Sequence, residues 1–454
     1  MSSEAAKKHY ENLLIIHDPN SQNLMKGLEI VKKYIIREKL ILTGGMAIDF
    51  ALRLHKKKLY DDDAIPDYDF ITPHHWIDAY EIAQWLSRIG MKEISVINAM
   101  HPTTMKIRLN FVGIADITYN PENIFKNIPQ LNYHGFNFVH PHYQFIDQHR
   151  ALSMGYEKLE MGWPVAPDRW KKDMTRYDIL WAEYPLTWTG EGNIELDIEK
   201  TITKEILNNQ CITGFLALQY WICWAKEKGF KTSWNLGKYE TTKTGATYVI
   251  PIDSHGCTLY TNDINELYKK IHSKYKIKDE RFYNRFLDKL PRKVIMDNQW
   301  ELLDNKNTWI AAHKVDGFHV ANLQPIMMYL LANYIILNKI IKEDRGYPFY
   351  AGYMVCRELL QFGADNAIPE LLPTAEYYGT DNFSEAYMLA AMKFDKSNRQ
   401  NNDSTEAIPL QPHHVYDRDM AHKKVPNIYY KFKPSESILF AMDGERCKSF
   451  LGKN

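Results

Sequence analysis

The sequence has no hydrophobic run near the roughly 20 residues of a membrane-spanning helix, so we predict no membrane segment. Residues Met1 to Tyr10 lack the apolar core of a secretory signal, and we expect no export. The five cysteines include no CxxC pair, which argues against structural zinc and a disulfide framework and favours a reducing compartment. Basic and acidic residues both number 56, which excludes a globally basic nucleic-acid binder but allows a local basic cleft.

A pair of glycines stands between two apolar segments near the N-terminus. Residues 40–42 predict a short buried strand, and residues 46–55 predict a helix, with Gly44 and Gly45 as the turn between them. Because glycine has no side chain, backbone N–H groups and the helix N-terminus can approach phosphate oxygens there. By itself the pair is better explained as an ordinary strand-to-helix turn.

Three aspartates follow the glycine pair. Asp67 and Asp69 open a predicted strand at i and i+2, and therefore share one face of it. Two like charges at the start of an apolar strand are costly without a cation. Asp116 lies in the apolar run 112–117 of the next predicted strand. The alternatives are a solvated loop for the pair and a backbone-bonded buried Asp116, but the combination predicts a Mg²⁺ or Mn²⁺ site.

Basic residues accompany the acids in the predicted strand 105–119. If no bulge intervenes, Lys106 and Arg108 lie on the same strand face as Asp116, because each is an even number of residues away from it. They are candidate phosphate contacts. Gly113 is a candidate bulge position in the same segment.

A second basic group falls on a predicted helix that starts near residue 168. Arg169, Lys172 and Arg176 are spaced i, i+3 and i+7, which places them in one basic stripe. We interpret the stripe as a contact to nucleotide phosphate or RNA backbone, with a solvated helix face as the alternative. The nearby histidines match no zinc spacing, and we expect surface positions for His140, His142 and His149.

The order of predicted elements indicates an α/β (α+β) fold with two lobes. Residues 1–185 predict a small domain on one mixed sheet, and residues 196–454 a second lobe. Residues 211–218 echo 41–48, so 200–300 is interpreted as a degenerate repeat in which Gly256 and Thr258 replace Asp67 and Asp69. We further expect helices at 197–207 and 325–362, a mainly helical 300–454, and a polar loop near 397–411.

The chain resembles the catalytic poly(A) polymerases of large cytoplasmic DNA viruses. The resemblance is to the African swine fever virus and giant-virus type, and more distantly to the poxvirus catalytic subunit. It covers roughly the first 180 residues and rests chiefly on the segments 40–53, 66–70, 105–108, 115–121 and 169–173. The glycine pair and three aspartates are shared by the whole nucleotidyltransferase superfamily, whereas the surrounding residues point to the viral subfamily.

The resemblance implies template-independent addition of AMP from ATP to RNA 3′ ends, in viral mRNA 3′-end formation. It implies a nucleotidyltransferase-fold first lobe and a degenerate nucleotidyltransferase copy with added helices as the second. Asp67 and Asp69 would hold two Mg²⁺ or Mn²⁺ ions, and Asp116 would complete the site. Gly44, Gly45 and nearby basic groups would cradle the phosphates.

Several alternatives stay open from the sequence. The chain could transfer nucleotides to a small molecule or protein, or be an inactive RNA-binding scaffold. A homodimer or a viral processivity partner is compatible with it. The implied location is the viral factory in the host cytoplasm, or the virion.

Overall fold

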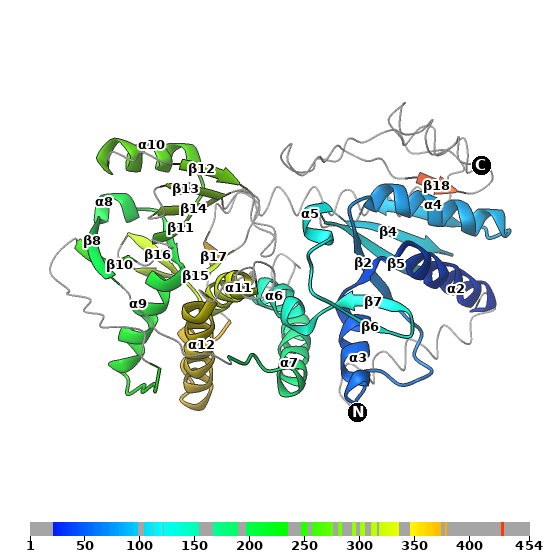
Figure 1. Cartoon of the computed structure of the whole chain (residues 1–454), viewed down its shortest axis with the longest axis horizontal. Helices are drawn as coiled ribbons and strands as arrows, with labels where there is room; N and C mark the ends of the chain where they lie inside the picture. Colours follow the sequence, from blue (N-terminus) through cyan, green and yellow to red (C-terminus); the bar gives the residue numbers. More distant parts are fainter. Residues whose placement is uncertain are drawn as a thin grey trace. The chain divides into compact units, whose positions relative to one another are not determined.

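The structure is a computed structural model, shown in Figure 1. It describes residues 21–98, 104–110, 112–120, 122–153, 167–188, 197–234, 247–252, 257–275, 280–283, 293–296, 300–304, 310–315, 317–335, 346–373, 377–378 and 428–430. The expectation of a mixed α/β fold is confirmed. Within these residues no helix combines the length and the apolar character that crossing a membrane requires.

The chain divides into two compact units, 1–144 with 389–454 and 145–388. Unit 1 is built on a mixed sheet in the order β18-β3-β4-β5-β2-β1-β7-β6. Its strands are β1 Ile41–Leu42, β2 Tyr68–Thr72, β3 Ile94–Asn98, β4 Thr104–Leu109, β5 Val112–Tyr119, β6 Gln130–Tyr133, β7 Phe136–Val139 and β18 Ile428–Tyr430. Its helices are α2 Ser21–Glu38, α3 Gly44–Leu54, α4 His75–Arg88 and α5 Glu122–Phe125, and α6 Pro141–Leu152 begins there.

Helices α2 and α4 cover one face of the first sheet (Figure 1). The apolar stripe of α2 is buried as its spacing predicts, with Leu24, Leu28, Val31 and Ile35 all at most 5% exposed. A Cβ at Gly27 would meet Leu86, Leu109 and Ile114, which shows how closely α2 approaches α4 and the sheet. Because side chains alternate along a strand, the polar residues of β4 and β5 point to the opposite face.

Unit 2 contains a second mixed sheet, in the order β12-β13-β14-β11-β9-β16-β15-β17. Its strands are β9 Cys211–Thr213, β11 Cys257–Thr261, β12 Glu280–Tyr283, β13 Lys293–Met296, β14 Trp300–Asp304, β15 Ile310–Val315, β16 Phe318–Ala321 and β17 Tyr377–Tyr378. Its helices are α7 Pro167–Glu183, α8 Lys204–Leu207, α9 Gly214–Lys226, α10 Ile264–Tyr275, α11 Leu323–Tyr334 and α12 Tyr347–Asp365. A separate two-stranded sheet pairs β8 Asp197–Thr203 with β10 Thr247–Ile252.

The two large sheets repeat one topology. In each, the helix-linked pair β1/β2 or β9/β11 is antiparallel, and the next strand, β5 or β14, is parallel to its neighbour. Strands β7 and β16 run parallel to β1 and β9, the first strand in chain order of their respective large sheets. The internal repeat suggested by the short sequence echo is therefore present as a complete strand order.

The division of the chain differs from the expected one at three places. The units separate at Gln144, well before the expected boundary between 185 and 196, and 389–454 groups with unit 1. The second copy extends beyond residue 300 through β14, β15 and β16, so the described part of 300–454 contains sheet strands besides the helices α11 and α12. Of the helix expected over 197–207, only 204–207 form one, α8, whereas 197–203 form strand β8 because they pair with β10.

Two other expectations concern residues that the structure describes only in part or not at all. The helix expected over 325–362 appears as α11 and α12, which flank undescribed residues. The polar loop near 397–411 and position Gly256 lie outside the described residues.

Candidate active site

Three charged side chains occupy one row across the strands β2, β5 and β4. Asp69 lies directly opposite Asp116 in the parallel pair, and Asp116 lies directly opposite Lys106 in the antiparallel pair. Directly opposed residues on one face of a sheet have Cβ atoms roughly 4.5–5.5 Å apart. The expected grouping of these residues on one sheet face is therefore seen.

Asp116 forms an ion pair with Lys106, whose Nζ lies 2.9 Å from the carboxylate Oδ2. The two side chains are 29% and 36% exposed, so the pair is only partly shielded from water. Burial raises the pKa of Asp116 above its usual value, and the negative charge of Asp67 adds to that rise. Lys106 and Arg108 act in the opposite direction on this pKa, because they stabilise the carboxylate.

A bulge does interrupt the β4–β5 pair, as the glycine in this segment suggested. The register shifts so that Ile107 faces Ala115 while Arg108 faces Gly113. The extra residue lies on β5, and β4 keeps its regular alternation, so Lys106 and Arg108 remain on the same half-exposed face.

The glycine turn is fixed beside the second aspartate. The N–H of Thr43 donates to the carbonyl oxygen of Asp69 at 2.9 Å, which joins the start of α3 to β2. Gly44 has φ +65°, a value that L side chains rarely adopt, and a Cβ at this position would collide with the Asp69 carboxylate. The turn therefore requires glycine both for its backbone angle and for the space it leaves to Asp69.

The loop that leads to Asp67 is held by a residue that sequence reasoning did not select. Asp49 on α3 is 2% exposed, and its Oδ1 accepts the backbone N–H groups of Leu59 at 2.8 Å and Tyr60 at 3.0 Å. Arg53, one helical turn later, pairs with Asp49 and with Asp62 of the loop. An acid and a base at i and i+4 in an otherwise apolar helix is the signal that could have indicated this role.

The carboxylate oxygens of Asp67, Asp69 and Asp116 suit a divalent ion, but the three carboxylates do not form a complete metal site. Carboxylate oxygens are what Mg²⁺ and Mn²⁺ prefer in proteins. Asp67 is exposed, Asp69 lies beside the glycine turn, and Asp116 is paired with Lys106. Among the described residues, no three His, Cys, Asp or Glu side chains are close enough together to hold a metal ion. Metal binding at this row stays a prediction.

The basic stripe falls on α7, which belongs to unit 2. Lys172 and Arg176 are half-buried on this helix, and of Arg169 only the backbone is described. The structure confirms the helix, whereas the role of the stripe in phosphate or RNA contact stays a prediction.

The expectation of surface histidines was wrong for His142 and His149, which are 8% and 1% exposed. His149 is the more deeply buried of the two. Its ring nitrogens bond to Gln324 at 2.7 Å and to the Tyr353 hydroxyl at 2.6 Å, and Tyr353 bonds to the Tyr177 hydroxyl at 2.9 Å. Burial lowers the pKa of His149 to about 3, with the charge of Arg357 acting in the same direction. His149 is therefore a neutral core residue that links α6, α7, α11 and α12.

The second sheet places a different set of side chains at the equivalent positions. Thr213 and Thr258 are paired as Thr43 and Asp69 are, so Thr258 replaces Asp69 as expected. Gly214 has φ +64° and repeats Gly44.

The third acid is retained in this copy, which the sequence reasoning missed. Glu301 faces Thr258 as Asp116 faces Asp69, and Ile295 stands opposite Glu301 where Lys106 stands opposite Asp116. Glu301 is 3% exposed and accepts hydrogen bonds at 2.9 Å from the Thr258 and Tyr329 hydroxyls. Helix α11, which carries Tyr329, covers this position, so the carboxylate serves packing and not an open site.

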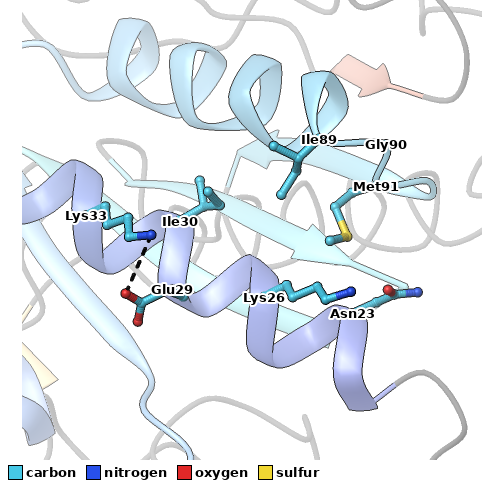
Figure 2. A pocket seen from close by; sticks show the side chains of 8 residues that line it. All are labelled: Asn23, Lys26, Glu29, Ile30, Lys33, Ile89, Gly90 and Met91. Atoms are coloured by element: carbon cyan, nitrogen blue, oxygen red, sulfur yellow. Dashed lines mark ion pairs between the residues drawn. The ribbon is translucent and has the colours of Figure 1, made fainter.

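A hollow on unit 1 is separate from the row of Asp69, Asp116 and Lys106, the acidic row. It lies between α2 and the end of α4, as Figure 2 shows, and Glu29 inside it is paired with Lys33 at 3.9 Å. None of the predicted site residues lines it, because its lining consists of Asn23, Lys26, Glu29, Ile30, Lys33, Ile89, Gly90 and Met91.

The segment that contains the acidic row is similar to known viral proteins. Residues 29–158 match the family model described as the poly(A) polymerase catalytic subunit. A protein of African swine fever virus (isolate Pig/Kenya/KEN-50/1950), provisionally named a poly(A) polymerase catalytic subunit, is 37% identical over 180 residues. That match covers 39% of this chain and 37% of the viral protein. The correspondingly named protein of Acanthamoeba polyphaga mimivirus is 29% identical over 161 residues, covering 35% of this chain and 26% of that protein.

The matches thus span little more than a third of the African swine fever virus protein and about a quarter of the mimivirus protein. For the fold, the crystal structure of the Megavirus polyadenylate synthase superimposes with a TM-score of 0.66 at 17% identity. The superposition covers 99% of this chain and 88% of the Megavirus chain. The described part of the chain therefore shares the fold of that structure, a nucleotidyltransferase fold.

Proposed function

We propose that this chain, whose residues 29–158 match the poly(A) polymerase catalytic-subunit family, is a polynucleotide adenylyltransferase of a large cytoplasmic DNA virus. The observation that carries the proposal is the row of Asp69, Asp116 and Lys106, with Asp67 just before it and the glycine turn beside it. A nucleotidyltransferase needs this combination of carboxylates and a phosphate-binding turn. The enzyme adds AMP from ATP to RNA 3′ ends and acts in viral mRNA 3′-end formation, in the host cytoplasm.

In the proposed reaction an RNA 3′-oxygen attacks the α-phosphorus of ATP, a P–O bond forms, and pyrophosphate leaves. Two bound Mg²⁺ or Mn²⁺ ions would lower the pKa of the attacking hydroxyl and neutralise the leaving pyrophosphate. Asp67 and Asp69 would hold both ions and Asp116 would complete the set. The turn at Gly44 and Gly45 presents backbone at the start of α3 for the β- and γ-phosphates.

The duplicated fold supports the assignment of the chemistry to unit 1. Only one of the two copies presents its carboxylates at a partly exposed face among the described residues, because Glu301 in unit 2 is covered and bonded to hydroxyls. The stripe of Arg169, Lys172 and Arg176 on α7 is proposed to contact nucleotide or RNA phosphates. A homodimer or a processivity partner is compatible with this activity.

The test is to incubate the purified chain with a labelled RNA and each nucleoside triphosphate in turn, with Mg²⁺ or Mn²⁺. We expect the RNA to be extended with ATP far more than with the other three triphosphates, and without a template. Labelling of protein or of a small acceptor in place of RNA would indicate a nucleotidyltransferase of another substrate class. RNA binding without any transfer would indicate an inactive scaffold.

A further inference from the structure

The row of charges in unit 1 contains a feature that the reaction itself does not require. The Asp116 oxygen Oδ2, in a carboxylate proposed as a metal ligand, lies 2.9 Å from the ammonium group of Lys106. The lysine sits directly across from Asp116 on β4, so the contact follows from strand register. A fixed positive charge is therefore provided at the position where a divalent ion would bind.

The second sheet provides an internal comparison for this lysine. There the equivalent acid, Glu301, faces Ile295, and its Oε2 accepts hydrogen bonds from the Thr258 and Tyr329 hydroxyls. That copy lacks the aspartate at position 258, and its acid is buried under α11. The lysine thus accompanies the copy whose acids are partly exposed and adjacent to one another, and it is absent where a single acid is buried and bonded to hydroxyls.

Electrostatics explain what the lysine does in unit 1. Asp116 has Asp69 as its neighbour on one side and Lys106 on the other, and Asp67 adds a further negative charge nearby. Without a cation these carboxylates repel one another. Lys106 supplies one compensating charge from within the chain, but it also occupies an oxygen that a metal ion would need.

We propose that Lys106 is a built-in counter-ion that competes with the divalent metal for Asp116, so that the nucleotide-free chain binds the metal only weakly. When a nucleoside triphosphate arrives with its own metal, the phosphates offer Lys106 an alternative anionic partner and Asp116 is released. Metal loading is thereby coupled to nucleotide binding. This inference rests on the proposed function, because it assumes that the Asp67–Asp69–Asp116 row is the metal site.

The experiment measures binding of Mn²⁺ to the full chain without nucleotide, by the loss of the free-ion electron paramagnetic resonance signal. We expect Lys106→Met to bind Mn²⁺ about tenfold or more tightly than the wild type, since a competing charge is removed. Lys106→Gln is a second neutral variant in case the methionine disturbs folding. Lys106→Arg keeps the charge and should keep the weak binding.

The matched control is Lys126→Met. Lys126 pairs with Glu122 at 2.6 Å on α5, so this change also removes a lysine from an ion pair, but outside the acidic row. Its Mn²⁺ affinity should equal that of the wild type. Adding Asp116→Asn to Lys106→Met should abolish the gain.

A second readout is the thermal stability of the same variants. Lys106→Met should have a lower melting temperature than the wild type without metal, and Mn²⁺ should restore it, because a ligand that binds the folded state stabilises it. A purely structural ion pair would not be replaced by Mn²⁺. Equal or weaker Mn²⁺ binding by both Lys106→Met and Lys106→Gln would overturn the inference, even if the wild type extends RNA. If the wild type transfers no nucleotide, the proposed function fails instead.

Discussion

At the residue scale, some residues of the candidate site could be predicted from the sequence and others could not. Asp67, Asp69 and Asp116 could be predicted because isolated acids in apolar strands are costly unless they have a partner. Glu301 is likewise an acid followed by apolar residues in a strand, yet it is a covered residue bonded to Thr258 and Tyr329. What separates the two cases is the tyrosine that α11 brings, a contact between distant parts of the chain.

Gly44 should be essential for activity, and Gly44→Ala tests this. The substitution places a Cβ against the Asp69 carboxylate at a backbone angle of φ +65°. The backbone angle alone costs about 1–2 kcal/mol of stability. Because the collision also moves a proposed metal ligand, we expect nucleotide incorporation to fall by about a hundredfold. The measurement is initial rate of RNA extension together with the melting temperature.

The control for this change is Gly90→Ala. Gly90 also has a positive φ, +84°, but a Cβ there meets no atom within 4 Å. It should lose similar stability and keep its rate of RNA extension. Equal loss of rate in the two variants would show that backbone strain, and not the approach to Asp69, explains the effect.

At the element scale, periodicity predicted the local elements around the candidate site of unit 1 and failed where pairing partners lie far away. The stripe of α2 and the strand-turn-helix of β1 and α3 are local patterns, and they appear as expected. Strand β8 lies where the sequence analysis expected a helix. Its apolar residues Ile198 and Ile202 are four apart, a spacing that fits both the helical and the strand period. Pairing with β10, which begins at Thr247, decides the matter, and sequence periodicity does not contain that information.

The buried histidine of α6 predicts how the stability of unit 2 depends on pH. The pKa of His149 is lowered to about 3 in the folded chain, against about 6.5 in an unfolded one. Between these values the unfolded state binds a proton that the folded state does not. The contribution of His149 to the free energy of unfolding is therefore complete above pH 6.5. It is lost as pH falls towards 3, at about 1.4 kcal/mol per pH unit.

His149→Gln should remove this dependence. We expect the difference in unfolding free energy between pH 7 and pH 5, measured with urea, to be smaller in the variant than in the wild type. His75 has a similarly lowered pKa, of about 3, so a residual decrease is expected in both proteins. Equal pH dependence in the wild type and the variant would refute the assignment to His149.

The basic stripe of α7 gives a prediction about RNA. Charge reversal at Arg169, Lys172 or Arg176 should weaken binding of RNA or nucleotide and flatten its dependence on salt, because each phosphate contact releases a counter-ion. Fluorescence anisotropy over a salt series measures both quantities. Lys171→Glu, at an exposed position outside the stripe, is the control for a general charge effect. Unchanged affinity in all three stripe variants would support a solvated helix face.

At the scale of the whole molecule, the chain is a duplicated sheet in which one copy presents acids and the other covers its remaining one. The sequence suggested the repeat through a short echo around Gly214, but it could not show that the second copy reaches as far as β16. That extent depends on parallel pairings between strands up to 108 positions apart, such as Cys211 with His319. The carboxyl-terminal strand β18 likewise joins the first sheet by pairing with β3, which no local pattern indicated.

The central claim is that the carboxylate row of unit 1 performs adenylate transfer. The most direct measurement is the incorporation of labelled AMP into RNA by Asp69→Ala and Asp67→Ala, with melting temperatures recorded in parallel. The account predicts loss of incorporation in both variants with the fold retained, because these carboxylates hold the metal and repel one another without it. Incorporation above about a few per cent of the wild-type rate in a folded variant, where loss of a metal ligand predicts near-abolition, would contradict the assignment of the site.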